Sequence, residues 1–389
     1  MTFKLNVMLN WLIYAEAPTG IINSQVIDFA RRFEHEHNMV STIWVLSPLS
    51  NYWTTRRSYQ NVCGSVNVRI VPMLPFQGKH FCWKWNCLLL ALATTGKPNT
   101  LWLARGPKSG EMVLGLKRFR RNTHLVYLSR GSVHDEAHEH TNHSSGLVSI
   151  ASEKRSLARA NHVMAVSPQL IERHEELYGD IGILNRHSIC PTLIDSKRII
   201  DASEKRARNA NPLRVAFVGG GQTWQSLNLL NAGLTALITS SQAEIVHFRY
   251  LGNPSDIENI KFDSKITVQS GRVQPNEVVR ELAKYDYGLL LRDSSYTNKV
   301  STPTKFAEYC AAGLIPVISG VPFFENLMNE RQVPFGSFHS GENSITWHHL
   351  VVDDAESHKD RIVEFVRKDL SEQSPYFQNF VDVVKRFAT

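Results

Sequence analysis

The sequence predicts an α/β protein with two doubly wound parallel sheets, one in each half of the chain. Short apolar segments alternate with amphipathic, helix-like segments in both halves, and this alternation is typical of parallel sheets covered by helices. A polar, charged stretch at 201–212 separates the two series and is expected to be a linker. The 389 residues suit two or three domains and suffice to bury a full core.

The first half, expected to form an N-terminal domain over 1–205, begins with a strand. The expected strands are short apolar runs at 5–12, 42–46, 66–71, 100–103, 124–128 and 162–166. The expected helices, whose apolar residues recur at helical spacing, are at 21–33, 81–94, 148–160 and from Pro168 onward. Ser167 is the expected N-cap of the last helix, because a serine oxygen can accept a hydrogen bond from a free N–H of the first turn.

The second half, expected to form a C-terminal domain over 206–375, repeats the pattern. Strands are expected at 214–218, 244–251, 266–269, 287–291 and 315–319, and helices at 224–238, 276–284 and 304–312. The last segment, 376–389, is amphipathic, with Phe380, Val384 and Phe387 on one face. It therefore reads as a helix that packs against a core.

Charge is distributed unevenly along the chain. The net charge of +7 divides into +8 for residues 1–205 and −1 for the remainder. A basic half suggests an anionic partner, which could be nucleic acid, a membrane surface or a phosphorylated substrate. Nucleic acid is disfavoured because no RRM, helix-turn-helix or zinc-binding pattern is present.

Further sequence features bear on the compartment. Five cysteines with no C-x-x-C pair indicate reduced thiols in a cytoplasmic protein. No export signal is visible, and no apolar run approaches the roughly 20 residues of a membrane-spanning helix. We therefore expect a soluble or peripheral protein.

Three consecutive glycines follow the expected strand 214–218 and precede an expected helix: Gly219, Gly220 and Gly221. Glycine lets the backbone approach a phosphate closely, and a helix N-terminus offers free N–H groups. The segment, with Gln222 after it, is a candidate phosphate loop. It does not match G-x-G-x-x-G, since Trp224 occupies the last glycine position, and an ordinary tight turn is the alternative.

A second candidate site surrounds the start of the expected helix 304–312. Polar side chains gather between the preceding strand and the first turns of this helix: Arg292, Asn298, Ser301, Thr302, Lys305 and Glu308. Thr302 is the expected N-cap, with Pro303 at the first helical position. We expect the helix N-terminus and Lys305 to bind a diphosphate, and Glu308 to bind a ribose. The alternative is a capped helix with a solvated Lys305–Glu308 pair.

The segment 298–318 resembles the C-terminal signature of GT-B glycosyltransferases of family 4 (group 1), in which a helix beginning P-S/T-K continues with E-Y/A-x-A-x-G before a P-V-V/I strand. The segments 159–179, 188–195 and 271–288 resemble other family segments in the same order. Together they extend over most of the chain from about 124 to 320.

This resemblance implies two Rossmann-like domains that face each other across a cleft, with the C-terminal helix returning to the N-terminal domain. It also implies a nucleotide-sugar donor on the second domain and an acceptor on the first, with no cofactor and no metal. Glu308 would hold the ribose, while 219–221 and 301–305 would hold the diphosphate. Retention of anomeric configuration is usual in the family, but Val300 stands where its first signature glutamate would be, and the basic residue after the glycine loop is missing. Arg292 and Lys305 could supply that positive charge.

Polar residues after the expected strand 124–128 are candidates for acceptor contact or for a general base: Arg130, His134, Asp135 and Glu136. If the enzyme inverts, Asp135 or Glu136 would deprotonate the acceptor. The pair His134 and His138 raises the alternative of a metal, but the motif lacks the glutamate of H-E-x-x-H. The loop after the first strand adds further acceptor-side candidates: Glu16, Thr19 and Gly20.

Two segments suggest peripheral contact with the inner face of a membrane. Segment 80–90 combines aromatic residues, a lysine and a leucine patch, and 117–121 is a basic run around Phe119. Two ordinary helices are the alternative. The sequence thus predicts a glycosyltransferase that acts on a glycan or lipid-linked acceptor, as in surface polysaccharide or glycoconjugate biosynthesis. A non-catalytic nucleotide-sugar-binding subunit and a GT-B epimerase or phosphorylase are the other possibilities.

Overall fold

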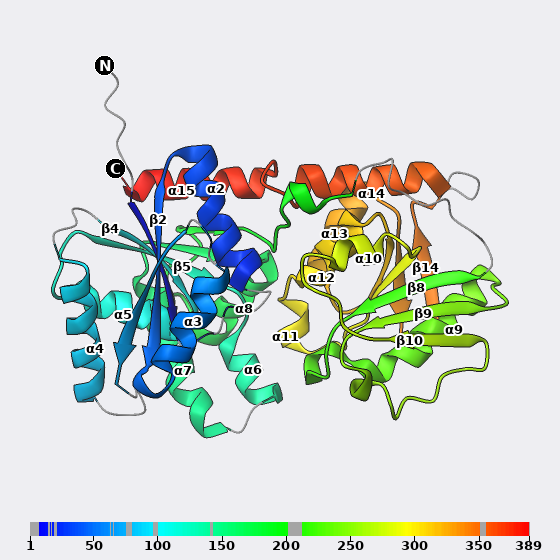
Figure 1. The fold of residues 1–389 in the computed structure, drawn as a ribbon, viewed down its shortest axis with the longest axis horizontal. Coiled ribbons are helices and arrows are strands. Elements are labelled where there is room, and N and C mark those ends of the chain that lie inside the picture. Colours follow the sequence, from blue (N-terminus) through cyan, green and yellow to red (C-terminus); the bar gives the residue numbers. More distant parts are fainter. Residues whose placement is uncertain are drawn as a thin grey trace, which may run out of the picture. The chain divides into compact units, whose positions relative to one another are not determined.

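The computed structural model divides the chain into two compact units (Figure 1). The first comprises Met1–Cys190 with Tyr376–Thr389, and the second Pro191–Pro375. The described residues are 8–14, 16, 18, 22–62, 64, 66–74, 80–95, 100–140, 143–200, 212–350 and 355–388.

The first unit is built on a seven-stranded sheet in the order β3-β2-β1-β4-β5-β6-β7, in which every neighbouring pair is parallel. The strands are β1 (Met8–Tyr14), β2 (Val40–Pro48), β3 (Asn67–Met73), β4 (Thr100–Arg105), β5 (Thr123–Ser129), β6 (His162–Ala165) and β7 (His187–Ile189). The expected strands are confirmed, apart from residues 5–7, which lie outside the described part. β7 was not predicted, because three residues give no recognisable pattern. The parallel order brings the carboxyl ends of all seven strands to one edge.

Helices cover both faces of this sheet. They are α2 (Asp28–His37), α3 (Tyr52–Val62), α4 (His80–Ala93), α5 (Gly106–Leu116), α6 (Val133–His140), α7 (His143–Arg159), α8 (Pro168–Tyr178) and α15 (Pro375–Ala388), and a π-helical turn at Asn23–Ile27 leads into α2. The N-cap at Ser167 is confirmed, since its Oγ accepts a hydrogen bond from the Leu170 N–H at 3.2 Å. The sequence did not predict α3, which is mostly polar, or α5, which opens on Gly106 and Pro107.

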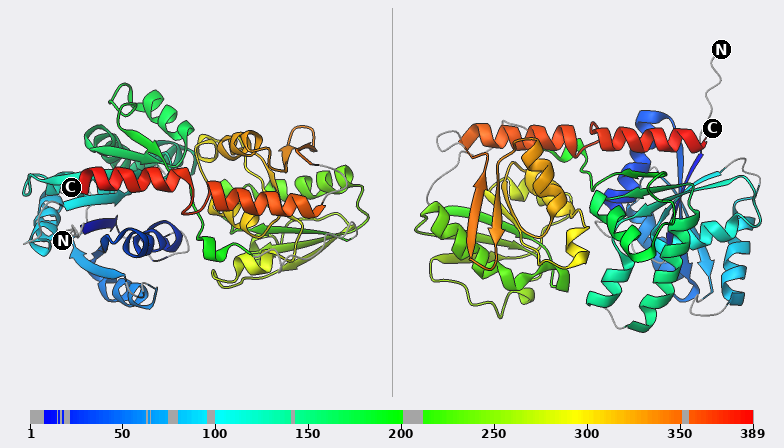
Figure 2. Two further views of the ribbon diagram at one scale, coloured as in Figure 1. Left: turned by 90° about the horizontal axis from the view of Figure 1, so that it is seen from above. Right: turned by 180° about the vertical axis from the view of Figure 1, so that it is seen from behind.

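The C-terminal helix α15 packs into the first unit, as expected (Figure 2). The Phe380 ring lies 6.2 Å from Trp11, 5.8 Å from Phe29 and 5.4 Å from Phe33, measured between ring centroids. All four aromatic residues are almost fully buried. A segment remote in sequence therefore completes the core of this unit.

The second unit contains another seven-stranded sheet, in the order β10-β9-β8-β11-β12-β13-β14. Its strands are β8 (Leu213–Val218), β9 (Val246–Leu251), β10 (Ile266–Ser270), β11 (Tyr287–Leu290), β12 (Ile315–Ile318), β13 (Phe335–His339) and β14 (Ser344–His348). The predicted parallel sheet is confirmed, with one antiparallel strand added at its edge, where β14 pairs with β13. Neither strand was predicted, since both are short and flank a tight polar turn.

The helices of the second unit are α9 (Leu230–Ser241), α10 (Val278–Leu282), α11 (Tyr296–Lys299), α12 (Thr304–Ala311), α13 (Pro322–Glu330) and α14 (Ala355–Asp369). The helix predicted at 224–238 is wrong in its first part. Short 3-10 turns occupy Thr223–Gln225 and Leu227–Leu229, and Ser226 between them has a φ of 49°, which interrupts the helix. The backbone after the glycine loop therefore folds as a compact bend.

The chain enters the second unit earlier than the expected boundary near residue 205. Ile194 N–H donates to the Leu370 carbonyl at 2.8 Å, and Ile200 N–H donates to the Ala311 carbonyl at 3.1 Å. These backbone bonds attach the segment after Pro191 to α12 and to the end of α14. Most of the expected linker, 201–211, lies outside the described residues.

Within the described ranges, no helix has both the length and the apolar character needed to cross a bilayer. Cys87, Cys190 and Cys310 are buried, and no disulfide joins the cysteines that the structure describes.

Candidate functional site

A cavity of about 470 Å³ opens at the carboxyl ends of β8, β9 and β10 in the second unit. Its lining comprises Val218, Gly219, Gly220, Gly221, Gln222, Leu251, Gly252, Asn253, Asp256, Arg272, Val273, Pro275, Val278 and Glu308. The glycine loop and Glu308, two features predicted separately from the sequence, thus contribute to one cavity. A ligand at this sheet edge is the general expectation for an open α/β fold.

The glycine loop lies against Lys305. A Cβ atom at Gly219 would lie 2.1 Å from Gln225 Oε1 and 2.7 Å from Lys305 Nζ, so any larger residue would displace these two side chains. Gln225 Oε1 accepts hydrogen bonds from the Gly220 N–H, at 3.1 Å, and from Lys305 Nζ. The lysine is therefore fixed beside the loop that was predicted to hold phosphate.

Two buried cations lie near this loop. Burial and the neighbouring Arg292 charge lower the pKa of Lys305 well below its usual value, while the Glu308 carboxylate raises it. Burial lowers the pKa of Arg292 to about 10. Its Nη1 donates to the Trp224 carbonyl, whereas its buried Nε has no hydrogen-bond partner among the described residues. A phosphate group bound beside them would favour the protonated, positively charged form of both side chains.

Glu308 lies on the wall of the cavity, on α12. Its Oε1 accepts from Arg198 Nη2 at 3.2 Å, and its side chain is 17% exposed. Burial raises the pKa of Glu308, and the Arg198 charge opposes that shift. The carboxylate is therefore oriented by Arg198 and remains accessible from the cavity.

Five predicted donor residues do not line the cavity. Arg292 and Lys305 lie beside the glycine loop, and Asn298, Ser301 and Thr302 have partners elsewhere. Asn298 Nδ2 donates to Asp293 Oδ1 at 2.8 Å, and Ser301 Oγ donates to the Asn298 carbonyl at 2.8 Å. Thr302 is not the N-cap of α12, because Pro303 takes that position with ψ 135°. The Thr302 Oγ1 instead accepts from the Thr192 N–H at 3.1 Å. These side chains brace the loop before α12.

Sequence reasoning missed several cavity residues. Asn253 and Asp256 follow β9, and Arg272 and Pro275 follow β10. Their position just after parallel strands was the available signal. Arg272 is an exposed cation on the cavity, and Asp256 Oδ2 accepts from the Tyr250 hydroxyl at 3.0 Å.

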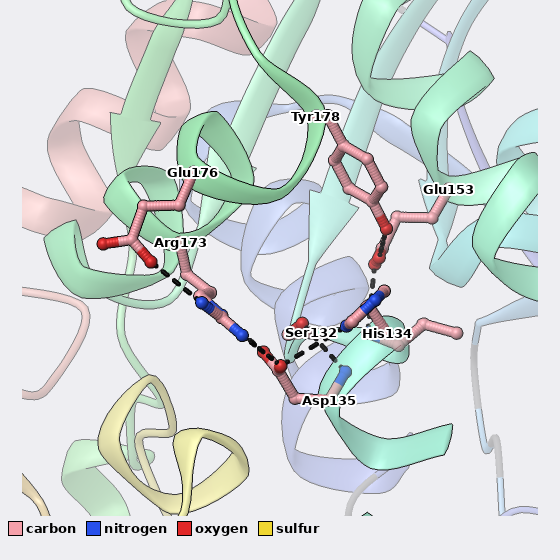
Figure 3. Close-up of polar contacts among 8 residues, drawn as sticks. Ser132, His134, Asp135, Glu153, Arg173, Glu176 and Tyr178 are labelled. Carbon is pink, nitrogen blue, oxygen red and sulfur yellow. Dashed lines mark hydrogen bonds and ion pairs between the residues drawn. The ribbon is translucent and has the colours of Figure 1, made fainter. Parts of the chain in front are cut away.

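In the first unit, Asp135 is part of a buried polar network rather than a free base (Figure 3). Its two carboxylate oxygens accept from Arg173 Nε at 3.0 Å and Nη2 at 2.7 Å. Ser132 Oγ accepts from the Asp135 backbone N–H at 3.3 Å. Burial by itself would raise the pKa of Asp135, but the hydrogen bonds from Arg173 lower it overall. A fully paired, acidic carboxylate is a poor proton acceptor.

The same network contains an acid that the sequence did not reveal. Glu153 on α7 is fully buried, and its Oε2 accepts from the Tyr178 hydroxyl at 2.8 Å (Figure 3). Burial raises the pKa of Glu153 to about 8, although the Tyr178 hydroxyl and the Val133 N–H oppose that rise. At neutral pH this side chain is therefore mainly protonated.

The remaining candidates on α6 are more accessible. Glu136 is more exposed than Asp135, but enough protein surrounds its carboxyl group for burial to raise its pKa. The Arg105 charge opposes this rise, and the Asp135 charge adds to it. The His134 and His138 rings lie 4.4 Å apart between centroids. Among the described residues, no group of three or more His, Cys, Asp or Glu side chains gathers as metal ligands would.

Arg130 directly follows β5, and its guanidinium nitrogens are buried without a hydrogen-bond partner in the described part of the chain. Glu16 Oε2 accepts from Arg105 Nε at 3.4 Å. The other predicted acceptor-side residues, Thr19 and Gly20, lie outside the described residues.

No protein-family profile matches the sequence, and no curated protein matches it. Solved structures do match. Sucrose-phosphate synthase from Thermosynechococcus elongatus is similar with a TM-score of 0.64 at 13% identity, over 98% of this chain and 99% of its own. The pneumococcal O-GlcNAc transferase GtfA in complex with UDP and GlcNAc gives 0.65 at 9% identity, over 99% of both chains. A glycosyltransferase from Rickettsia africae ESF-5 gives 0.64 at 10% identity, over 98% and 99%.

These neighbours define the class of fold. Both units have the Rossmann-like architecture of GT-B glycosyltransferases, and the similarity extends over almost the full length of each chain. The predicted fold class is confirmed.

Proposed function

We propose that this chain is a glycosyltransferase of the family 4 type that takes a sugar from a nucleotide-diphosphate donor. The observation that supports this most directly is the cavity of the second unit, where Gly219 lies against Lys305 and Glu308 forms part of the wall. Phosphate oxygens would bind at the glycine loop and Lys305, and ribose hydroxyls at Glu308. Lys305 and Arg292 would stabilise the negative charge that develops on the departing diphosphate. No cofactor or metal enters this proposal.

A thermal-shift panel of nucleotide sugars tests the donor site, because a ligand that binds only the folded state raises the unfolding temperature. Lys305→Met and Glu308→Gln should each remove the shift that the true donor produces. Lys284→Met just after α10 and Glu330→Gln on α13, both exposed, are the matched controls and should keep the shift. Binding that survives in both site variants would contradict the assignment.

Turnover separates the enzyme from a non-catalytic binding subunit. The specific observation in favour of the subunit is Val300, which is 2% exposed, so an apolar core residue stands where the family has a glutamate. Release of nucleoside diphosphate, with an acceptor or by slow hydrolysis, supports the transferase. Donor binding without release of nucleoside diphosphate in any acceptor mixture supports the non-catalytic subunit. Isomerisation of the donor sugar supports the epimerase, and phosphorolysis of a glycan supports the phosphorylase.

We propose that transfer proceeds with retention of anomeric configuration. Inversion needs a base on the acceptor side. Asp135, one of the two first choices, already accepts hydrogen bonds from Nε and Nη2 of Arg173 with its two carboxylate oxygens. Glu136 and Glu16 remain as bases for the alternative. Proton NMR of the fresh product decides between the two outcomes through the anomeric coupling constant.

We also propose that the first unit binds a glycan or lipid-linked acceptor at the cytoplasmic face of a membrane, with residues 80–90 and 117–121 in contact with lipid. Trp85 and Phe119 are exposed, and the Arg118 guanidinium lies 5.4 Å from the Trp83 ring centroid. Exposed aromatic residues beside cations suit an anionic interface. Sedimentation with phosphatidylglycerol vesicles should fall in Trp85→Ser and persist in Trp53→Ser, whose tryptophan is also exposed and lies on α3.

A further inference from the structure

Arg130 is a buried cation without a counterion at the carboxyl edge of the first sheet. Its Nε, Nη1 and Nη2 atoms are all shielded from solvent, and none hydrogen-bonds to any residue within the described ranges. The Glu136 carboxylate lies over Gly131, the residue after Arg130, where a Cβ would be 2.6 Å from its Oε1. The structure gives Arg130 no ion pair with it.

The groups that act on Arg130 do not neutralise it. Burial lowers the pKa of Arg130 to about 10, a shift that Cys190 opposes and Arg105 increases, so the guanidinium is charged at pH 7. Burial raises the pKa of the Cys190 thiol to about 11, so this group is neutral at that pH. Neither Cys190 nor Arg105 therefore supplies a negative charge to Arg130.

Arg105 provides a second cation at the same sheet edge. It is the last residue of β4, and its register partner on β5 is Leu128, two residues before Arg130. Its Nη1 donates to Gln25 Oε1 at 2.6 Å and its Nε to Glu16 Oε2 at 3.4 Å. These contacts fix the orientation of Arg105 and compensate its charge, but they do not reach Arg130.

Burying an unpaired charge costs several kcal/mol, and a fold tolerates it where a ligand supplies the opposite charge. The planar guanidinium fork matches phosphate oxygens and carries its charge at any physiological pH. We infer that Arg130, next to Arg105, binds a phosphate group of the acceptor in the first unit. The assignment of this phosphate to an acceptor rests on the proposed function, whereas the phosphate site itself does not.

Inorganic phosphate is the probe, and chloride at equal ionic strength is the reference. The experiment uses the full chain with Lys305→Met, so that the candidate donor site does not contribute. Phosphate should raise the unfolding temperature of this parent, and adding Arg130→Met should abolish the rise. Arg121→Met is the matched control, because it removes the same charge from an exposed residue just before β5 and should keep the rise.

In chloride, Arg130→Met should unfold at a higher urea concentration than the parent, because it removes an unpaired buried charge. If Arg130→Met does not fold, Arg130→Lys replaces it; its single ammonium group should give a smaller phosphate shift than the parent. An equal shift in the parent and in whichever Arg130 variant folds would overturn the proposal.

A second arm identifies the source of the phosphate, with Lys305 restored. The probes are UDP, GDP and ADP. If the phosphate belongs to the acceptor, Arg130→Met keeps the shift given by the best nucleotide. A lost nucleotide shift would mean that Arg130 contacts the donor diphosphate, and it would overturn the acceptor assignment. No nucleotide shift in any variant would count against the proposed function while leaving the phosphate result intact.

Discussion

Arg173 on α8 binds both carboxylate oxygens of Asp135 on α6, at 3.0 Å and 2.7 Å. The Asp135 side chain is 5% exposed and the Arg173 side chain 16% exposed, so the pair is shielded from solvent. Arg173 Nη1 also donates to Glu176 at 2.9 Å. The residue that the sequence offered as a base is thus a structural anion.

Arg173→Met should destabilise the protein by about 3 kcal/mol, because it leaves Asp135 buried without its counter-charge. Urea unfolding followed by circular dichroism measures the change. The double variant Asp135→Asn, Arg173→Met should recover part of the loss, since no buried charge remains. A single variant as stable as the wild type would show that solvent, rather than Arg173, satisfies Asp135.

Glu153 should make stability fall as the pH rises. The pKa of Glu153 is raised to about 8 in the folded protein, against 4.5 for an ordinary glutamate, so the folded state holds the proton more tightly. Between these two values each rise in pH therefore favours the unfolded chain. Relative to its value below pH 4.5, the free energy of unfolding falls by on the order of 4 kcal/mol at pH 8.

Glu153→Gln keeps an acceptor for the Tyr178 hydroxyl and removes this titration. Urea midpoints from pH 5 to pH 8 should therefore fall more steeply in the wild type than in Glu153→Gln. Exposed Glu172→Gln on α8 is the control and should follow the wild type. Parallel profiles for wild type and Glu153→Gln would mean that Glu153 is ionised in the folded protein.

Gly219→Ala should lower affinity for the donor by at least about tenfold. The new methyl group would overlap Gln225 Oε1, Lys305 Nζ and the Phe217 ring, so the loop and lysine must move apart. Gly220→Ala is the control in the same loop, because its Cβ would meet only the flexible end of Gln222, at 3.0 Å. Isothermal titration with the donor found in the thermal-shift panel gives both affinities; equal losses would disprove the specific role of Gly219.

Phe380→Ala should cost about 3–5 kcal/mol, the usual penalty for deleting a large buried aromatic side chain. The ring fills the space between Trp11, Phe29 and Phe33, so its removal leaves a cavity in the core of the first unit. Phe119→Ala, at a residue 51% exposed, should change stability by less than about 0.5 kcal/mol. Similar thermal midpoints for both variants would show that α15 adds little to this core.

Local patterns were sufficient for most elements and failed where the signal is weak. The strands that flank the site are short apolar runs, and the spacing of apolar residues together with the length of each run is enough to predict them. α5 was missed because Gly106 and Pro107 at its start read as a turn, although Met112 and Val113 are buried against the sheet. β14 was missed because its antiparallel pairing depends on β13 rather than on its own residues.

The residues of the candidate site also fall into two groups, those that a local motif predicts and those that it does not. The glycine loop and Glu308 could be predicted, since each follows from a local motif at the end of a strand or on a helix. Arg272 was missed although its position just after β10 was a local signal. Arg198 could not be predicted, because its place near the cavity depends on its contact with Glu308, 110 residues later.

The sequence alone determined that the chain is α/β with two parallel sheets, and it determined which residues stand at the ends of their strands. The tertiary structure decided what those residues can do. Asp135 became a structural anion because Arg173, 38 residues later, reaches it. Arg130 stayed without a counterion because no described carboxylate pairs with it. Local patterns place a charged group on an element, whereas its pKa and reactivity depend on burial and on partners that only the folded chain brings near.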